Sequence, residues 1–189
     1  MKTPEELAAM VSWTPPYNAY QKKGELAAML QLVKKHNPKT ILEIGTHFGG
    51  TAWAMQQLCP KARLICVDNN ILDLSFDTGE QLTSLGVKAD FIDGNSQIQE
   101  TLDRVKELET TIDFVHIDAD HSAEGARADW ELYSTLVPKG GIIALHDICP
   151  DVEAHGVAPL WEEIKAEYKT EELWDLSEPN WGGIGIVYK

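Results

Sequence analysis

An apolar strand that runs into a glycine turn and then a helix is the feature that most constrains the fold of this chain. Residues 41–51 read Ile-Leu-Glu-Ile-Gly-Thr-His-Phe-Gly-Gly-Thr. Gly45 allows a tight turn after the strand, and Gly49 lets a ligand approach the main chain closely. The free N–H groups of the following helix point into the same space. This segment is typical of an open α/β sheet with a nucleotide-sized pocket.

Seven short apolar runs alternate with helical patterns, which predicts a doubly wound, mostly parallel sheet. The runs are Thr40–Ile44, Arg63–Val67, Ala89–Ile92, Ile112–Ile117, Ile142–His146, Leu173–Ser177 and Ile184–Tyr188. Only six residues separate the last two runs, whereas a parallel crossover needs a dozen or more. We therefore expect the last strand to be antiparallel. Residues 1–36 are expected to form a helical cap or lid on a single globular unit, in which residues 37–189 form the main domain.

Composition narrows the possible partners. Acidic residues outnumber basic ones 30 to 16, for a net charge of −14, which disfavours nucleic acid and anionic membranes as partners. No apolar run approaches the length of a membrane span. Cys59, Cys66 and Cys149 lack metal-binding spacing and fit a reducing cytoplasm. The expected partner is a small molecule, with a homodimer as a base-rate expectation.

Polar residues follow the second and third predicted strands, where ligands lie in such sheets. Asp68 comes at the end of the second strand and can accept hydrogen bonds from ribose hydroxyls. An alternative role for Asp68 is to cap a helix. Asn95, Ser96 and Gln97 follow the third strand, and Ser96 is equally suited to capping the next helix.

A second group of polar residues follows the fourth and fifth predicted strands. Asp118 and His121 follow one of these strands, and His146 and Asp147 end the other. Two carboxylates with imidazole groups suit a divalent cation, and they also suit proton abstraction from a hydroxyl group. Helix capping and salt bridging are the alternative for this group.

Several motifs together resemble the class I S-adenosylmethionine-dependent methyltransferases. The first is Glu-x-Gly-x-x-x-Gly at 43–49, which differs from the Gly-x-Gly-x-x-Gly spacing of dinucleotide-binding turns. The others are Asp-Ala-Asp-His-Ser-Ala-Glu-Gly at 118–125 and Pro-Lys-Gly-Gly-Ile-Ile-Ala-Leu-His-Asp at 138–147. These resemble the group that includes the macrocin-type sugar O-methyltransferases and the cephalosporin hydroxylase-like proteins. The resemblance implies strand order 3-2-1-4-5-7-6.

The same resemblance implies methyl transfer from S-adenosylmethionine to a hydroxyl oxygen of a small molecule. The cofactor-binding residues would be Glu43, Gly45, Thr46, Gly49, Asp68, Asn95, Ser96, Gln97 and Asp118. The catalytic residues would be His121 as general base, Asp118 and His146. The ligands for Mg²⁺ or another divalent metal would be Asp118, His146 and Asp147. His146 stands where the relatives have an acid, which shifts the metal preference toward ions that accept nitrogen.

Two other functions stay open. A nicotinamide-dependent oxidoreductase is disfavoured by the glycine spacing and by the terminal antiparallel strands. A non-catalytic protein could also retain this fold. We expect substrate choice to depend on the N-terminal segment and on the loop at about residues 148–157, which contains His155.

Overall fold

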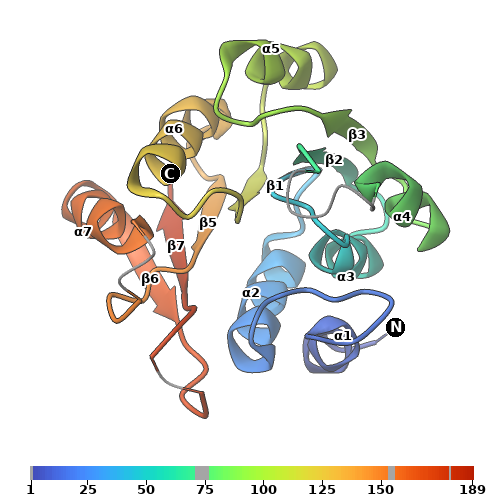
Figure 1. The fold of residues 1–189 in the computed structure, drawn as a ribbon, viewed down its shortest axis with the longest axis horizontal. Coiled ribbons are helices and arrows are strands. Elements are labelled where there is room, and N and C mark those ends of the chain that lie inside the picture. Colours follow the sequence, from blue (N-terminus) through green and yellow to red (C-terminus); the bar gives the residue numbers. More distant parts are fainter. Residues whose placement is uncertain (1, 71–76, 153–155, 179) are drawn as a thin grey trace.

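A seven-stranded sheet forms the centre of the computed structural model, which describes residues 2–70, 77–152, 156–178 and 180–189 (Figure 1). The strands are β1 (Thr40–Ile44), β2 (Arg63–Asp68), β3 (Asp90–Asp93), β4 (Phe114–Ile117), β5 (Ile142–His146), β6 (Lys169–Leu173) and β7 (Ile184–Tyr188). Their order is β3-β2-β1-β4-β5-β7-β6. Strands β1 to β5 pair in parallel, and β7 is antiparallel to both of its neighbours. The predicted fold class and strand order are confirmed.

Helices cover both faces of this sheet. One face carries α1 (Pro4–Val11), α2 (Lys23–His36), α3 (Gly50–Leu58) and α4 (Thr78–Ser84). The other carries α5 (Gln99–Leu108), α6 (Ala123–Tyr133) and α7 (Val157–Glu167), with a short 3₁₀ turn, η1 (Ser134–Leu136), after α6. None of the helices in the described part of the chain is long and apolar enough to cross a membrane.

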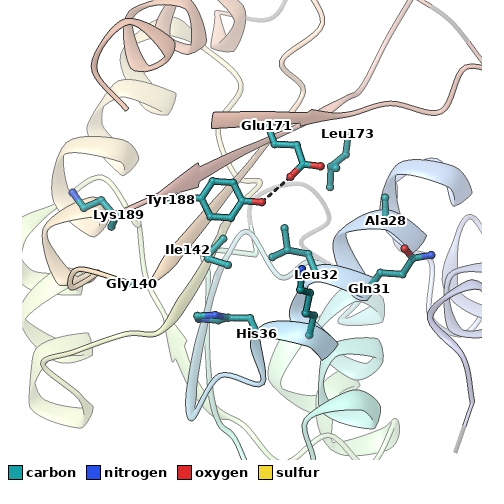
Figure 2. Close-up of a pocket in the computed structure, with 12 residues that line it drawn as sticks. Ala28, Gln31, Leu32, His36, Gly140, Ile142, Glu171, Leu173, Tyr188 and Lys189 are labelled. Carbon is teal, nitrogen blue, oxygen red and sulfur yellow. Dashed lines mark hydrogen bonds between the residues drawn. The ribbon is translucent and has the colours of Figure 1, made fainter. Parts of the chain in front are cut away.

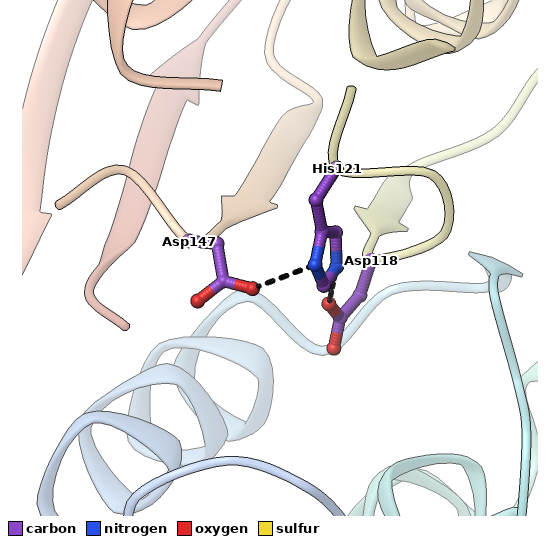
Figure 3. Close-up of side chains that lie close together, drawn as sticks. All are labelled: Asp118, His121 and Asp147. Atoms are coloured by element: carbon purple, nitrogen blue, oxygen red, sulfur yellow. Dashed lines mark hydrogen bonds and ion pairs between the residues drawn. The ribbon is translucent and has the colours of Figure 1, made fainter. Parts of the chain in front are cut away.

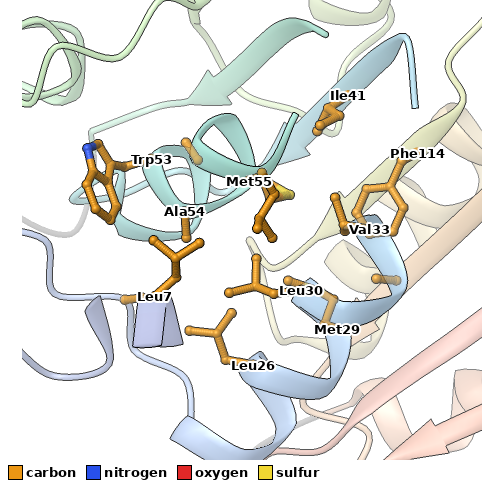
Figure 4. Close-up of a cluster of buried hydrophobic side chains, with 14 of the residues drawn as sticks. Leu7, Leu26, Met29, Leu30, Val33, Ile41, Trp53, Ala54, Met55 and Phe114 are labelled. Atoms are coloured by element: carbon orange, nitrogen blue, oxygen red, sulfur yellow. The ribbon is translucent and has the colours of Figure 1, made fainter. Parts of the chain in front are cut away.

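Alternating strand residues divide the interior into two cores. In β5, Ile142 and Ala144 pack with α2, whereas Ile143 and Leu145 pack with α6 and α7. Figure 4 shows the first core, in which Leu26, Met29, Leu30 and Val33 of α2 meet Met55 of α3 and Phe114 of β4. Side chains of the central strands therefore alternate between the two cores, so that every second one faces α2.

The N-terminal helices belong to this first core. Leu7 of α1 and Leu30 of α2 are fully buried in the same cluster as Ile41 and Phe114. The boundary between residues 1–36 and 37–189 stays a prediction, but the two parts share one hydrophobic core. The stretch between α1 and α2, residues 12–22, is the part of this segment that reaches the site described below.

The position of the sixth strand was predicted wrongly. The apolar pattern placed it at Leu173–Ser177, but β6 spans Lys169–Leu173. β6 is an edge strand, and its side chains at Lys169, Glu171 and Glu172 are exposed, so this strand needs no apolar run. The antiparallel pairing is confirmed, although the connection to β7 is longer than expected and covers residues 174–183.

Candidate active site

A cavity of about 550 Å³ lies at the carboxyl ends of β1, β2, β3 and β4. This is the sheet edge at which ligands bind in open α/β folds. Six residues predicted to bind the cofactor line the cavity: Gly45, Asp68, Asn95, Ser96, Gln97 and Asp118. His121, the predicted base, lines it as well. The structure therefore brings most of the predicted residues together around one space.

Three other predicted cofactor residues, Glu43, Thr46 and Gly49, are not among the residues that line this cavity. Glu43 is buried in β1, and its Oε1 lies 3.4 Å from Nδ1 of His116 on β4. Burial raises the pKa of Glu43, although His116 acts in the opposite direction. Gly49 is the N-cap of α3 with φ of +76°, so its role is to shape the turn.

Asp68 holds two turns of the cavity wall in place. Its Oδ2 accepts a hydrogen bond from the backbone N–H of His47 at 2.7 Å, and its Oδ1 accepts one from Asn70 at 2.8 Å. The next helix, α4, is capped by Asp77 instead. Asp68 therefore caps none of the helices in the described part of the chain, and its carboxylate joins the end of β2 to the turn after β1.

The turn after β3 is also built by polar contacts. The Asn95 side chain accepts a hydrogen bond from the Gln97 backbone N–H, and the Gln97 amide donates to Asp120 at 2.7 Å. Ser96 is buried, and its carbonyl accepts a hydrogen bond from the Tyr133 hydroxyl. The N-cap of α5 is Ile98, so Ser96 does not cap that helix. These contacts fix the wall of the cavity that lies beyond Asp68.

Gly45 brings the ends of β1 and β4 into close contact. Its φ is +85°, a backbone conformation that residues with a side chain rarely adopt. A Cβ atom at this position would lie 2.0 Å from the carbonyl oxygen of Asp118. Glycine is therefore needed here to set Asp118 beside the cavity.

Asp118, His121 and Asp147 converge at the end of β4 and β5 (Figure 3). His121 lies between the two carboxylates. Its Nε2 is 3.3 Å from Oδ1 of Asp118, and its Nδ1 is 3.2 Å from Oδ2 of Asp147. One ligand atom from each residue lies within 4.8 Å of the other two. We call these three residues the acid–histidine cluster.

Attraction between opposite charges sets the direction of the pKa shifts in the acid–histidine cluster. Burial acts to raise the pKa of Asp118, but the neighbouring His146 and His121 outweigh it and hold that pKa well below its usual range. Partial burial acts to lower the pKa of His121, but Asp118 and Asp147 outweigh it and raise that pKa. Asp118 therefore gives up its proton more readily than an ordinary aspartic acid, and His121 holds its proton more tightly than an ordinary histidine.

The role of His146 as a metal ligand and catalytic residue stays a prediction, and its ring lies deeper than that of His121. This side chain is buried, with its Nδ1 3.0 Å from Asp118 and its Nε2 3.0 Å from Glu25. Burial acts to lower its pKa, but Asp118, Glu25 and Asp147 outweigh it and raise the pKa well above the usual value. Both histidines have carboxylates at both ring nitrogens, but His146 is buried, whereas the partly exposed His121 belongs to the cluster with metal-ligand spacing.

Two residues at the start of α2 that sequence reasoning missed support Asp118 and His146. The Gln21 amide donates to Oδ2 of Asp118 at 2.8 Å, and its nitrogen lies 3.0 Å from Nε2 of His116. Glu25 is fully buried and accepts a hydrogen bond from the backbone N–H of Gly183 at 2.8 Å. The available signal was a polar residue within each of three buried strands, since Glu43, His116 and His146 each require a polar partner inside the protein.

A second cavity, of about 580 Å³, lies between α2 and the strands β5, β6 and β7 (Figure 2). Its lining includes Leu32 and His36 of α2, Ile142 at the start of β5, and Tyr188, whose hydroxyl donates to Glu171. None of the predicted site residues lines this cavity. The chemistry-bearing residues gather instead at the carboxyl ends of the strands.

Residues 153–155 of the loop expected to influence substrate choice, including His155, lie outside the described residues. The start of that loop is described. The backbone N–H groups of Ile148 and Cys149 donate to the carbonyls of Gly183 and Gly182. The chain that follows Asp147 therefore lies against the connection between β6 and β7.

Three solved structures that share this fold are methyltransferases. An O-methyltransferase from Bacillus cereus in complex with SAH has a TM-score of 0.72 and 19% identity, with 98% of this chain and 90% of that chain covered. TomG, an O-methyltransferase from Streptomyces achromogenes in complex with SAM, has a TM-score of 0.68 and 16% identity, with 100% and 91% covered. MycE from the mycinamycin pathway, in complex with Mg, SAH and mycinamycin VI, has a TM-score of 0.68 and 15% identity, with 100% and 54% covered.

Similarity at these identities concerns the fold. No curated protein sequence matches the chain. The family model described as "Methyltransferase domain" matches residues 42–148, which is more than half of the chain and includes β1 to β5 with Asp68, Asp118 and Asp147. The chain therefore belongs to the methyltransferase domain family.

Proposed function

We propose that this protein transfers the methyl group of S-adenosylmethionine to a hydroxyl oxygen of a small molecule. The observation that carries the proposal is the position of Asp118, which lines the cavity at the strand ends and also belongs to the acid–histidine cluster. Donor and acceptor would meet at this residue. The net charge of −14 favours a small-molecule acceptor over nucleic acid.

The residues around the cavity fit S-adenosylmethionine. The cavity has the size of small-molecule sites. The second lone pairs of the Asp68 oxygens would accept the ribose hydroxyls, and Asn95, Ser96 and Gln97 would contact the adenine. The neighbours TomG and the Bacillus cereus enzyme, with SAM and SAH bound, support this assignment. When bound, the cofactor supplies an electrophilic methyl group.

The acid–histidine cluster would prepare the acceptor. His121 is partly exposed and lies within hydrogen-bonding reach of two carboxylates, so its ring is held in one orientation. We assign it as the general base that removes the proton of the acceptor hydroxyl. Asp118 and Asp147 would orient the imidazole and stabilise its protonated form. Gln21 and His146 hold Asp118 in turn.

The same cluster fits a divalent cation. Two carboxylates and an imidazole offer oxygen and nitrogen ligands within 4.8 Å of one another. MycE contains Mg, which supports a metal in this fold. A bound cation would polarise the acceptor hydroxyl, and His121 would then be a ligand instead of a base.

Calorimetric titration with S-adenosylhomocysteine tests the proposal directly. We expect micromolar binding that Asp68→Ala weakens at least tenfold. Asp93→Ala is the matched control, because Asp93 is the exposed acid beside Asp68 in the neighbouring strand. Absence of binding to the unaltered protein would overturn the cofactor assignment.

Repeating the titration with Mg²⁺ or Mn²⁺ and after chelation tests the metal site. Metal-dependent heat that disappears in Asp147→Asn would assign the cluster to a cation. Transfer of radiolabelled methyl groups to a panel of hydroxyl compounds, undiminished by chelation and abolished in His121→Ala, would instead assign His121 as the base.

A further inference from the structure

Three aromatic side chains gather near the start of α2, and two of them are exposed. Trp13 and Tyr20 stack with ring centroids 4.6 Å apart, and Trp13 meets Trp181 edge-on at 6.0 Å. Trp13 is 54% exposed and Tyr20 is 46% exposed. Aromatic side chains of this size bury a large area when they find a partner. We call these three residues the aromatic rim.

The aromatic rim adjoins both the cofactor cavity and the cluster. The Tyr20 ring lies 5.0 Å from the ring of His47, which lines the cavity. The next residue, Gln21, hydrogen-bonds to Asp118. None of the three rim residues lines the cofactor cavity itself. The rim therefore borders the reacting end of the site without occupying the space for the cofactor.

Trp181 of the rim belongs to a segment that hydrogen-bonds to the chain after Asp147. Trp181 precedes Gly182 and Gly183, whose carbonyls accept hydrogen bonds from Cys149 and Ile148. Asp147 is thus flanked by the segment that carries Trp181. An acceptor that places a hydroxyl group at the cluster would have this segment beside it.

A buried lysine holds the rim in place. Lys22 is only 1% exposed, and its Nζ donates to the carbonyl oxygens of Glu178 at 2.6 Å and Trp181 at 2.5 Å. The same Nζ lies 4.6 Å from the centroid of the Trp181 ring and 3.8 Å from Glu25. Burying a lysine is costly unless it is paired and hydrogen-bonded. Here that charge fixes the Trp181 segment against the start of α2.

We propose that Trp13, Tyr20 and Trp181 bind the ring of the methyl acceptor, and that this acceptor is an aromatic hydroxyl compound. The proposal rests on the proposed methyltransferase function and adds the class of substrate. Planar rings stack on tryptophan and tyrosine, and the acceptor hydroxyl would then point toward His121.

Two probe compounds of similar size test the need for an aromatic ring. They are 4-ethylphenol and trans-4-ethylcyclohexanol, each titrated by ligand-observed NMR against the protein saturated with S-adenosylhomocysteine. We expect 4-ethylphenol to bind at least tenfold more tightly than the cyclohexanol. Equal binding of the cyclohexanol, or no detectable binding of the phenol at millimolar concentration, would overturn the proposal.

Variants connect this binding to the rim. Trp13→Ala and Trp181→Ala should weaken 4-ethylphenol binding about tenfold, whereas Trp13→Phe should retain most of it. Leu176→Ala is the control, because Leu176 is 87% exposed in the same connection between β6 and β7. Unchanged phenol binding in both alanine variants would also overturn the proposal. S-adenosylhomocysteine binding should be the same in every variant, and its loss in the unaltered protein would count against the cofactor assignment instead.

Discussion

The Nε2 atom of His146 lies 3.0 Å from the Oε1 atom of Glu25, and both side chains are buried. This contact ties the end of β5 to the first turn of α2. It also places the His146 imidazole between two carboxylates, those of Glu25 and Asp118. The cluster is thus supported from within the protein by a residue far away in the sequence.

Loss of the Glu25 carboxylate should be strongly destabilising. Glu25→Ala leaves the buried Lys22 and His146 without their common partner, and we expect the free energy of unfolding to fall by about 3–5 kcal/mol. Urea denaturation measures this loss. Glu162→Ala, at an exposed ion pair with Lys165, should change stability little. Similar losses of unfolding free energy in the two variants would show that the buried network stabilises the fold no more than an exposed ion pair does.

The pH dependence of turnover should report on His121. A base must be unprotonated, and Asp118 and Asp147 raise the pKa of His121 above 6.5 despite its partial burial. We therefore expect kcat/KM to rise with pH, with an inflection above 6.5, when measured with chelator present. Asp147→Asn should move that inflection to lower pH because one of the two charges is removed. A rate that stays constant from pH 6 to 9 would contradict the assignment of His121 as base.

Asp129 on α6 should make the fold less stable as pH rises. Its side chain is buried, and burial raises its pKa to about 7, although a hydrogen bond with Ser96 acts in the opposite direction. The folded protein then holds a proton that the unfolded chain releases near pH 4, so stability is lost between about pH 4 and 7. The loss is on the order of 4 kcal/mol at most.

Asp129→Asn should remove this pH dependence. The difference in unfolding free energy between the variant and the unaltered protein, measured in urea at pH 5 and pH 8, should shift in favour of the variant at pH 8. Asp103→Asn, at an exposed position on α5, serves as the control. A difference that is the same at both pH values would mean that Asp129 is ionised throughout.

Gly45 and Gly140 offer a matched pair of substitutions. Both have positive φ, at +85° and +91°, but only Gly45 has backbone atoms where a Cβ would lie. Gly140→Ala should cost about 1–2 kcal/mol from backbone strain alone. Gly45→Ala should cost more in a thermal melt and should also weaken S-adenosylhomocysteine binding, because Asp118 must move. Equal effects on both measurements would contradict the close approach of β1 and β4.

Much of the fold was predictable because buried strands carry a clear apolar pattern. β1, β5 and β7 begin and end where the pattern placed them. β6 was misplaced because its side chains face solvent, so its sequence does not need to be apolar. The strand order came from a resemblance between motifs, since apolar periodicity does not specify which strands are neighbours.

The candidate site was predictable only where residues follow the ends of strands. Asp68, Asp118, His121 and Asp147 are such residues, and the sheet topology brings their strand ends to one edge. Gln21 and Glu25 were missed because they lie just before and within the first turn of α2 and contact the site across the core. No local pattern reveals that contact; it depends on how α2 packs over β4 and β5.

Contacts from α2 and the two residues before it also bear on the order in which the protein folds. Gln21 contacts Asp118, 97 positions further along the sequence, Glu25 contacts His146, 121 positions further along, and Lys22 contacts Trp181, 159 positions further along. Closing such long loops is slow compared with local helix formation. During synthesis, each of these polar groups therefore stays hydrated until its own partner has emerged, Gln21 first and Lys22 last. The first strands of a nascent chain can form early, whereas the contacts around the reaction centre are completed only after Trp181 has been made.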